Sequence, residues 1–377
     1  MERTVDRPAP ALTGPERCTT VTGVDERTVL MLTNSDLTHD RLFLDAVEQM
    51  MLAELDRWDW GPVPELRRMV ASQLTRGGKR LRPLLAWTVA EAYGRSWQDI
   101  VAPATSVELY HLASLVLDDV QDNSDVRRGR PALHTTAATS TAINVAAVTR
   151  SLSYHLIHRC DGPTPQQKLA LHRELDTAAT CLVMGQSIDI GWGAGWYGQP
   201  ADFPYLSMVR WKTGSLFGCA AAMGAVIAGA PDTDTVRDFG LAFGSFYQGV
   251  DDYLDTFGDE TVLGRPRLED FRGGKLNAPL LRLLDVLTTA GDGETVKSIR
   301  DGLGDRDASW EWLLDLMHRH GIADALRRDL AQEATHLAAE HAANMPTGRS
   351  AGMARLIDTV MRRAGIPWQD PAITAHV

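Results

Sequence analysis

A chain of 377 residues with 44% hydrophobic content can fill a substantial core, and its formal net charge of −11 argues against a broad nucleic-acid-binding surface. Any bound anion must therefore be held by a local basic cluster or by a metal ion. Cys18, Cys160, Cys181 and Cys219 are widely spaced and form no CxxC pair, which argues against a zinc site and a disulfide framework and indicates a reducing, cytoplasmic location.

The predicted elements are helices. Residues 1–35 lack an apolar core, and we expect them to form a disordered tail rather than a signal peptide. Beyond them, apolar residues recur at steps of three and four, and the alternation typical of strands is scarce. We predict one all-α domain over residues 36–365 and a C-terminal tail at 366–377. The expected helices cover 38–58, 62–77, 81–93, 99–122, 136–160, 164–190, 203–257 with a break near Pro231, 276–291, and several segments after 307.

One segment, residues 214–231, carries no charge and is long enough to raise the question of a membrane span. It consists mainly of alanine and glycine and has few large apolar side chains. A helix buried in a large bundle explains this composition better than a span, so we expect no stable membrane insertion.

The helix predicted over 99–122 ends in an acidic cluster. Steps of three and four residues place His111, Asp118 and Asp122 on one side of this otherwise apolar helix, and Asp119 lies one position further round. A polar stripe on an apolar helix indicates a wet cleft inside the protein. Carboxylates this close together repel one another in a cleft, so the cluster predicts bound cations.

A second acidic cluster ends the helical run before residue 257. It places Gln248, Asp251, Asp252 and Asp255 on one side of a helix. One DDxxD sequence alone would be interpreted as a solvated helix end, but two copies, each after an apolar helix, favour a shared site. Magnesium usually takes one or two carboxylates and completes its shell with water and phosphate, so two such clusters predict a clamp for metal plus diphosphate. The missing turn glycine excludes a calcium loop.

Basic residues could complete such a site. In RGGKRLRP, Lys79 and Arg82 lie three apart at a helix start, an arrangement typical of phosphate binding. Arg80 follows the lysine, which excludes a Walker loop, and the GxGxxG match at 193–198 follows a helix rather than a strand and is interpreted as a loop. Further candidates, each a solvated charge if taken alone, are Arg127, Arg128, Lys212 beside Thr213, and Lys275.

Six motifs in this order make the chain resemble the trans-isoprenyl diphosphate synthases, or polyprenyl synthetases: GGKRLRP, ELYHLASLVLDDVQDNSDVRRGRP, MGQSID, KTGSLF, YQGVDDYLD and GGKLNAP. The resemblance covers residues 41–363 and is greatest to synthases of geranylgeranyl diphosphate. It implies an all-α bundle of the isoprenoid synthase type with a central active-site cavity. It also implies a homodimer that acts on small isoprenyl diphosphates, while the net charge argues against nucleic acids as partners.

The resemblance also implies residue roles. Asp118, Asp122 and Asp251 would be the principal ligands of three Mg²⁺ ions bridged by substrate diphosphate. Asp119, Asp252 and Asp255 would support them, with Asp255 counted in the metal set. Lys79, Arg82, His111 and Arg128 would hold the diphosphate of isopentenyl diphosphate, and Arg127, Lys212, Gln248 and Lys275 the allylic diphosphate, while Thr213 would lie beside the developing cation. Two positions depart from the usual pattern: Arg265 replaces a lysine and preserves its charge, and Asn277 replaces a common threonine.

The implied reaction condenses isopentenyl diphosphate with an allylic diphosphate. In this family a bulky residue five positions before the first aspartate stops chain growth early. That position is Ala113, and Tyr110 lies one turn deeper, about 4.5 Å or one isoprene unit further along the helix. We therefore expect a C20 product rather than C15, with longer products if Tyr110 swings aside.

Two rival interpretations remain open. A terpene cyclase on the same fold would need the magnesium site but not the four basic residues assigned to isopentenyl diphosphate. A non-catalytic partner subunit could lose its carboxylates without cost, yet all six are present.

Overall fold

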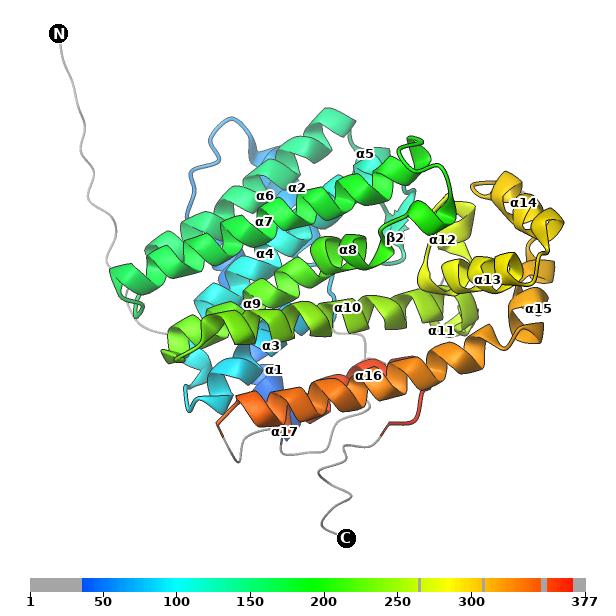
Figure 1. Ribbon diagram of the computed structural model, residues 1–377. Coiled ribbons are helices and arrows are strands. Elements are labelled where there is room, and N and C mark those ends of the chain that lie inside the picture. The colour runs from blue at the N-terminus through cyan, green and yellow to red at the C-terminus, as the bar shows by residue number, and fades with distance from the viewer. Residues whose placement is uncertain (1–35, 264–265, 307–308, 347–350, 369–377) are drawn as a thin grey trace.

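The computed structural model describes residues 36–263, 266–306, 309–346 and 351–368, and within them it is built almost wholly of helices (Figure 1). The all-α prediction is confirmed. The long helices are α1 (Asp36–Asp56), α4 (Trp97–Gln121), α6 (Thr139–Arg159), α7 (Pro165–Gly193), α10 (Thr233–Phe257) and α16 (Ile322–Asn344). The shorter ones are α2 (Pro64–Leu74), α3 (Leu81–Ala92), α5 (Leu133–Thr136), α8 (Tyr205–Val209), α9 (Ser215–Ala228), α11 (Glu260–Leu263), α12 (Glu269–Arg272), α13 (Ala278–Thr289), α14 (Gly293–Gly302), α15 (Glu311–Arg319) and α17 (Ala351–Arg363).

Three details differ from the helices expected from periodicity. The run predicted over 203–257 is divided into α8, a π-helical turn η2 (Arg210–Gly214), α9 and α10. A short antiparallel pair, β1 (Val126–Arg127) and β2 (Arg130–Pro131), follows α4, and a 3₁₀ turn η1 (Pro200–Asp202) precedes α8. The predicted ranges also lack the short helices α5, α11 and α12, and they lack α14, which begins within the turn sequence GDGE.

Helix α9 lies at the centre of the bundle and packs against α3, α4, α7 and α10. Its small residues permit this, because a Cβ on Gly224 would stand 2.6 Å from the Ala86 carbonyl oxygen of α3. At 14 residues, almost all buried, α9 is shorter than the roughly 20 residues that cross a bilayer. The one described helix with the length and composition of a span is α4, and 72% of its apolar window is buried inside the fold.

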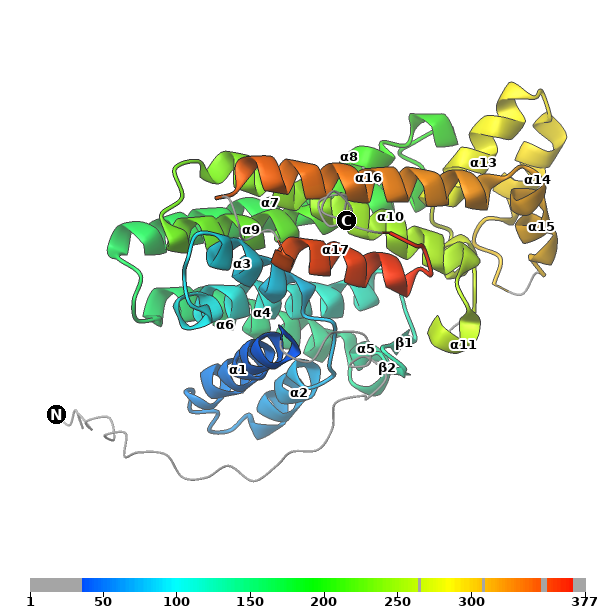
Figure 2. The same cartoon turned by 90° about the horizontal axis from the view of Figure 1, so that it is seen from below.

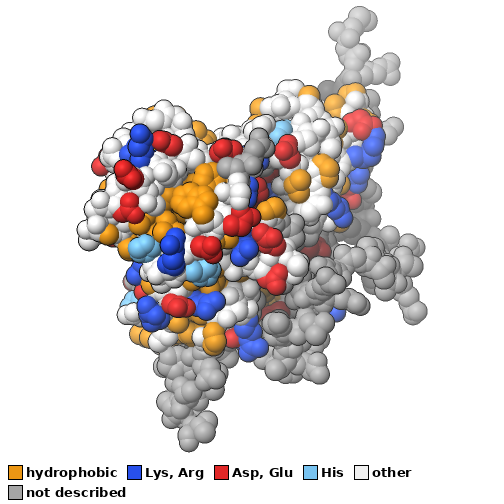
Figure 3. All heavy atoms as spheres, turned by 90° about the vertical axis from the view of Figure 1, so that its right-hand side faces the viewer, with side chains coloured by type: hydrophobic (Ala, Val, Ile, Leu, Met, Phe, Trp, Pro, Cys, Tyr) orange, Lys and Arg blue, Asp and Glu red, His pale blue; other side chains and the backbone are white. Residues whose placement is uncertain are grey.

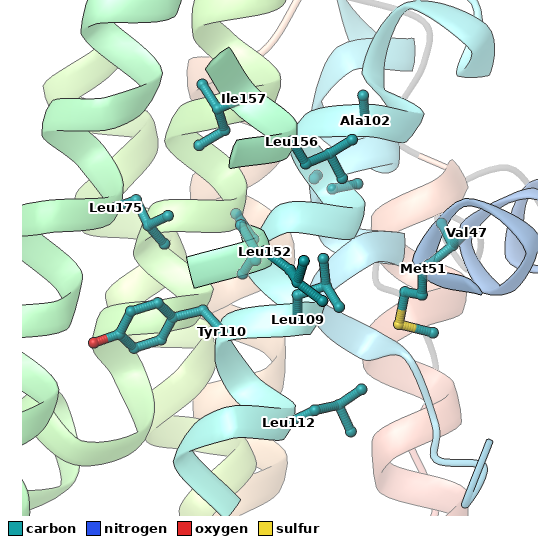
Figure 4. Packing of buried hydrophobic residues seen from close by; sticks show 14 of the residues in the cluster. Val47, Met51, Ala102, Leu109, Tyr110, Leu112, Leu152, Leu156, Ile157 and Leu175 are labelled. Carbon is teal, nitrogen blue, oxygen red and sulfur yellow. The ribbon is translucent and has the colours of Figure 1, made fainter. Parts of the chain in front are cut away.

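Clusters of buried apolar residues hold the described helices together. The largest joins α1, α2, α3, α4, α6, α7 and α9, and part of it is drawn in Figure 4. A second joins α3, α9, α10, α16 and α17, so that α17 lies against α3, α10 and α16 (Figure 2). The packing continues beyond residue 365, because Ile366 is buried and the Trp368 indole donates to Thr335 Oγ1 at 3.2 Å.

A buried histidine in the second cluster makes stability depend on pH. His341 is 1% exposed, packs edge-on against Phe239 and finds no hydrogen-bond partner for either ring nitrogen among the described residues. Burial lowers the pKa of His341 to about 4. The unfolded chain therefore takes up the proton first as the pH falls, so the folded state loses stability between the unfolded pKa of about 6.5 and pH 4.

We expect the variant His341→Leu to lose about 2 kcal/mol less stability than the wild type between pH 7.5 and pH 5. Urea unfolding of both proteins at the two pH values measures this difference. Equal losses in the two proteins would contradict the assignment to His341.

Candidate active site

The first acidic cluster lies at the end of α4 and is surrounded by cations. Lys212 Nζ lies 3.3 Å from Asp118 Oδ1, and Lys275 Nζ lies 2.5 Å from Asp122 Oδ2. Arg127, on β1, donates from Nε to Asp119 Oδ1 at 2.7 Å and from Nη2 to an Asp118 oxygen at 3.1 Å. The structure thus brings together the aspartates of α4 and the three cations assigned to the allylic diphosphate.

These contacts keep the first aspartate ionised. Burial by itself opposes ionisation, but Lys212, Lys275 and Arg127 outweigh it and lower the pKa of Asp118 to about 2. The pKa of Asp122 is raised by burial and by the charge of Asp118. For Lys212 and Lys275 burial lowers the pKa, but the surrounding carboxylates outweigh it and raise both pKa values.

Asp189, from MGQSID on α7, is a site residue to which the sequence reasoning gave no role. Its Oδ2 atom accepts from Lys212 Nζ at 2.5 Å and from Lys275 Nζ at 3.2 Å. Asp118, Asp122 and Asp189 therefore converge on two ammonium groups. The quoted MGQSID motif was the available signal, but its carboxylate could not be paired with two lysines before their positions were known.

This donor set fits Mg²⁺. The carboxylate oxygens of the cluster are hard ligands, and the two ammonium groups among them mark positions where positive charge is stabilised. Among the described residues, no three potential ligands form a preassembled metal cage. A bound ion would complete its shell with water and phosphate oxygens.

The second acidic cluster divides its carboxylates among three environments. Asp251 is paired with Arg363 of α17. Asp252 accepts from Tyr205 Oη at 2.5 Å, Gln248 Nε2 at 2.8 Å and the Ala278 amide at 3.0 Å. Burial, reinforced by Asp270, raises the pKa of Asp252 to about 7.

Asp255 is buried and bonded to the segment that leads into α12. It is 1% exposed, its Oδ2 atom accepts from the Asp270 amide at 3.3 Å, and its carbonyl accepts from the Leu268 amide at 2.8 Å. These bonds fasten the end of α10 to α12 and its preceding loop. Asp255 therefore also ties the second acidic cluster to α12.

Two short segments connect the acidic clusters. In η2, Lys212 contacts Asp118 while the neighbouring Thr213 donates to Gln248 Oε1 at 2.7 Å. Between α12 and α13, Lys275 contacts Asp122, and three residues later the Ala278 amide contacts Asp252. The clusters thus meet through these segments, and the π-helical turn places adjacent side chains on different clusters.

The residues assigned to isopentenyl diphosphate form a second basic group beside α3. Arg128 donates to the Gly77 carbonyl and covers Gly78, whose φ of +137° is accessible to glycine. Lys79 Nζ lies 3.2 Å from Tyr247 Oη, and the Arg82 guanidinium lies over the Phe217 ring at 4.4 Å.

His111 faces this basic group. Burial and the nearby arginines, Arg82 first, hold the pKa of His111 well below its ordinary value, so its ring is neutral at pH 7. Arg80, which the sequence reasoning used only to exclude a Walker loop, is buried and donates to Glu108 and to the Leu74 carbonyl. It anchors the loop that presents Lys79. Arg265 lies outside the described residues.

The residues expected to set product length lie deeper along α4. Ala113 and Tyr110 are both buried. Figure 4 shows the Tyr110 ring extending to the side of the core where Leu175 lies, away from Leu112. Two further rings, to which the sequence reasoning assigned no role, extend from Tyr110. Tyr110 meets Tyr154 edge-on at 6.2 Å, and Tyr154 stacks on His172 at 6.1 Å.

A cavity of about 650 Å³, within the usual size range of ligand pockets, opens beside Gly274, the neighbour of Lys275. It is lined by the end of α7, Gly274 and α14, and carries no residue of either acidic cluster. This end of the molecule, where α13, α14 and α15 lie, mixes acidic and basic side chains (Figure 3). The central cavity expected from the resemblance is a different feature and stays a prediction.

Comparison with known proteins places this arrangement in a family. The model of the polyprenyl synthetase family matches residues 63–309. The chain belongs to the polyprenyl synthetase family. The predicted family and the prediction of a prenyl-transferring enzyme are therefore confirmed.

Individual relatives agree with this assignment. Geranylgeranyl diphosphate synthase of Saccharolobus solfataricus is 30% identical over 282 residues, which span 72% of this chain and 81% of that protein. Geranylfarnesyl diphosphate synthase of Aeropyrum pernix is 35% identical over 229 residues, 59% of this chain and 70% of that protein. The crystal structure of geranylgeranyl pyrophosphate synthetase from Pyrococcus horikoshii has the same fold, with a TM-score of 0.75 at 23% identity, covering 86% of this chain and 99% of that one.

Proposed function

We propose that this polyprenyl synthetase condenses isopentenyl diphosphate with dimethylallyl, geranyl or farnesyl diphosphate and that its main product is C20 geranylgeranyl diphosphate. The observation that carries the proposal is the convergence of Asp118, Asp122 and Asp189 on Lys212 and Lys275. It combines carboxylates that suit divalent cations with ammonium groups that suit diphosphate.

Magnesium is the cofactor that we propose. Asp118, Asp122 and Asp251 would be its principal ligands, with Asp119, Asp252 and Asp255 in support. Bound magnesium would neutralise the negative charge that develops on the leaving diphosphate. Three ions bridged by the diphosphate are the arrangement that the resemblance implies.

The side chains of this chain divide the remaining work. Lys212, Lys275 and Arg127 would bind the allylic diphosphate and stabilise it as the allylic C–O bond breaks. Thr213 and Gln248 would offer uncharged oxygens to the resulting allyl cation without capturing it.

The second substrate then supplies the new bond. Lys79, Arg82, His111 and Arg128 would hold isopentenyl diphosphate with its C=C bond beside the cation. Its π electrons form the new C–C bond, and a proton is lost to the released diphosphate. Neutral His111 would contribute a hydrogen bond rather than a charge.

An assay with labelled isopentenyl diphosphate, magnesium and each allylic primer tests the proposal. A labelled prenyl diphosphate of C20 length is the expected product. Incubation with geranylgeranyl diphosphate alone separates the rival cyclase, because a hydrocarbon product would refute the synthase. The second basic group beside α3 supports the synthase, since a cyclase has no second diphosphate to hold.

Product length depends on the ring that closes the channel along α4. The S. solfataricus relative is named for a geranylgeranyl product, which supports C20, whereas the A. pernix relative is named for a longer one. We expect Tyr110→Ala to lengthen the main product by about one isoprene unit, because one helical turn of about 5 Å is opened. Chain-length analysis by chromatography measures this, with Leu112→Ala, which points the other way in Figure 4, as the control. An unchanged C20 product would refute the role of Tyr110.

We also propose a homodimer in the cytoplasm. Exposed apolar side chains on α7 and α8, Val183, Met184, Ile190 and Leu206, support an interface between two copies of the chain. Cys160, Cys181 and Cys219 are free thiols, as a reducing compartment requires. Sedimentation velocity should give twice the chain mass, and a monomer at micromolar concentration would refute the dimer.

A further inference from the structure

Asp189 is, among the described residues, the carboxylate that contacts both lysines beside the first acidic cluster. Its Oδ2 atom accepts from Lys212 Nζ at 2.5 Å and from Lys275 Nζ at 3.2 Å. Each lysine has one further carboxylate partner, Asp118 for Lys212 and Asp122 for Lys275. Asp189 therefore lies at the junction of two ion pairs.

The two lysines would lose their other partners when the site is loaded. Asp118 and Asp122 are the proposed magnesium ligands, and their oxygens cannot serve a metal and an ammonium group equally well. Two ammonium groups on one oxygen also repel each other, and that repulsion grows in a buried site. A third carboxylate, 9% exposed, is needed to keep both groups in place.

The backbone fixes Asp189 relative to Lys212. One turn earlier on α7, Gly185 approaches η2 so closely that a Cβ would stand 2.2 Å from the Lys212 amide nitrogen. Residues four apart lie on the same side of a helix, so this contact aims Asp189 at the Lys212 side chain. Lys275 is held from its own side, because its amide donates to the Asp270 carbonyl at 2.8 Å.

We propose that Asp189 is a positioning residue that holds the Lys212 and Lys275 ammonium groups as a pair, aimed at the allylic diphosphate, after Asp118 and Asp122 have turned to the metal. This inference rests on the proposed function. Asp189 itself acts through the lysines and is not a metal ligand.

The variant Asp189→Asn tests the inference because it keeps the side-chain shape and removes the charge. We expect kcat/KM for the allylic primer to fall on the order of 10²-fold, since misplaced groups cost about that much. The KM for isopentenyl diphosphate and the magnesium concentration at half-maximal rate should not change. Asp189→Glu should recover part of the loss, and the exposed Asp202→Asn is the matched control.

Binding of an inert thio-diphosphate analogue of the allylic primer, measured by calorimetry, gives a second readout. We expect weaker binding in Asp189→Asn, and no added weakening when Asp189→Asn is combined with Lys212→Met and Lys275→Met, because the residue acts through those lysines. Unchanged analogue binding, or a shifted magnesium requirement, would overturn the inference. If the wild type forms no product, the proposed function fails, while the binding comparison still decides the role of Asp189.

Discussion

Asp118→Asn is expected to reduce kcat/KM by about 10³-fold with both substrates present, as loss of an electrostatic group in an active site does. Burial opposes the charge of Asp118, yet Lys212, Lys275 and Arg127 lower its pKa to about 2, so the protein maintains an ionised carboxylate at considerable cost in desolvation. A neutral amide at this position would remove a proposed magnesium ligand and one of the carboxylates that Lys212 and Arg127 contact.

The loss of kcat/KM in Asp118→Asn can be distinguished from a loss of stability. Lys212 and Lys275 keep Asp189 as a partner, so Asp118→Asn should unfold at nearly the same urea concentration as the wild type. Asp125→Asn is the matched control, because Asp125 is an exposed aspartate in the loop after the same cluster. Steady-state kinetics over a range of magnesium concentrations measure the loss. Activity within tenfold of the wild type would show that the first DDxxD cluster does not do the work assigned to it.

Much of the fold follows from local patterns in the sequence. Apolar residues that recur every three or four positions predict the bounds of α1, α3, α4, α6, α7 and α10 to within a few residues. The predicted start of α4, at residue 99, is two residues late, although a capping signal is present. Ser96 precedes the helix, and its amide donates to Asp99 at 3.1 Å. No capping side chain marks the π-helical turn η2, and its close contact with Gly185 of α7 joins residues far apart in the sequence.

Some residues of the candidate site can likewise be predicted from the sequence, and others cannot. Each DDxxD cluster and the GGKR loop can be found because their charges are adjacent in the sequence. Asp189, Arg363 and Tyr154 could not be assigned roles, because each acquires its role from a residue far away along the chain, such as Lys212, Asp251 and Tyr110 respectively. A solvated charge and a site charge look identical until the helices are packed.

The close packing of α7 against η2 at Gly185 can be tested by substitution. We expect Gly185→Ala to lower the free energy of unfolding by about 3 kcal/mol, the upper part of the range for overpacked cores. The new Cβ would stand 2.2 Å from the Lys212 nitrogen and 2.7 Å from its Cα, and both are backbone atoms that no rotamer change can move. Relief would require α7 and η2 to separate.

That separation would carry Lys212 away from Asp118 and Asp189, so we expect kcat/KM to fall by about 10²-fold in the fraction that remains folded. Gly193→Ala on the same helix is the control, because a Cβ there meets nothing within 4 Å and should be neutral or stabilise by up to about 1 kcal/mol. Urea unfolding and kinetics on both variants measure the two effects. A Gly185→Ala protein as stable and active as Gly193→Ala would mean that α7 and η2 are not in the close contact that positions Lys212.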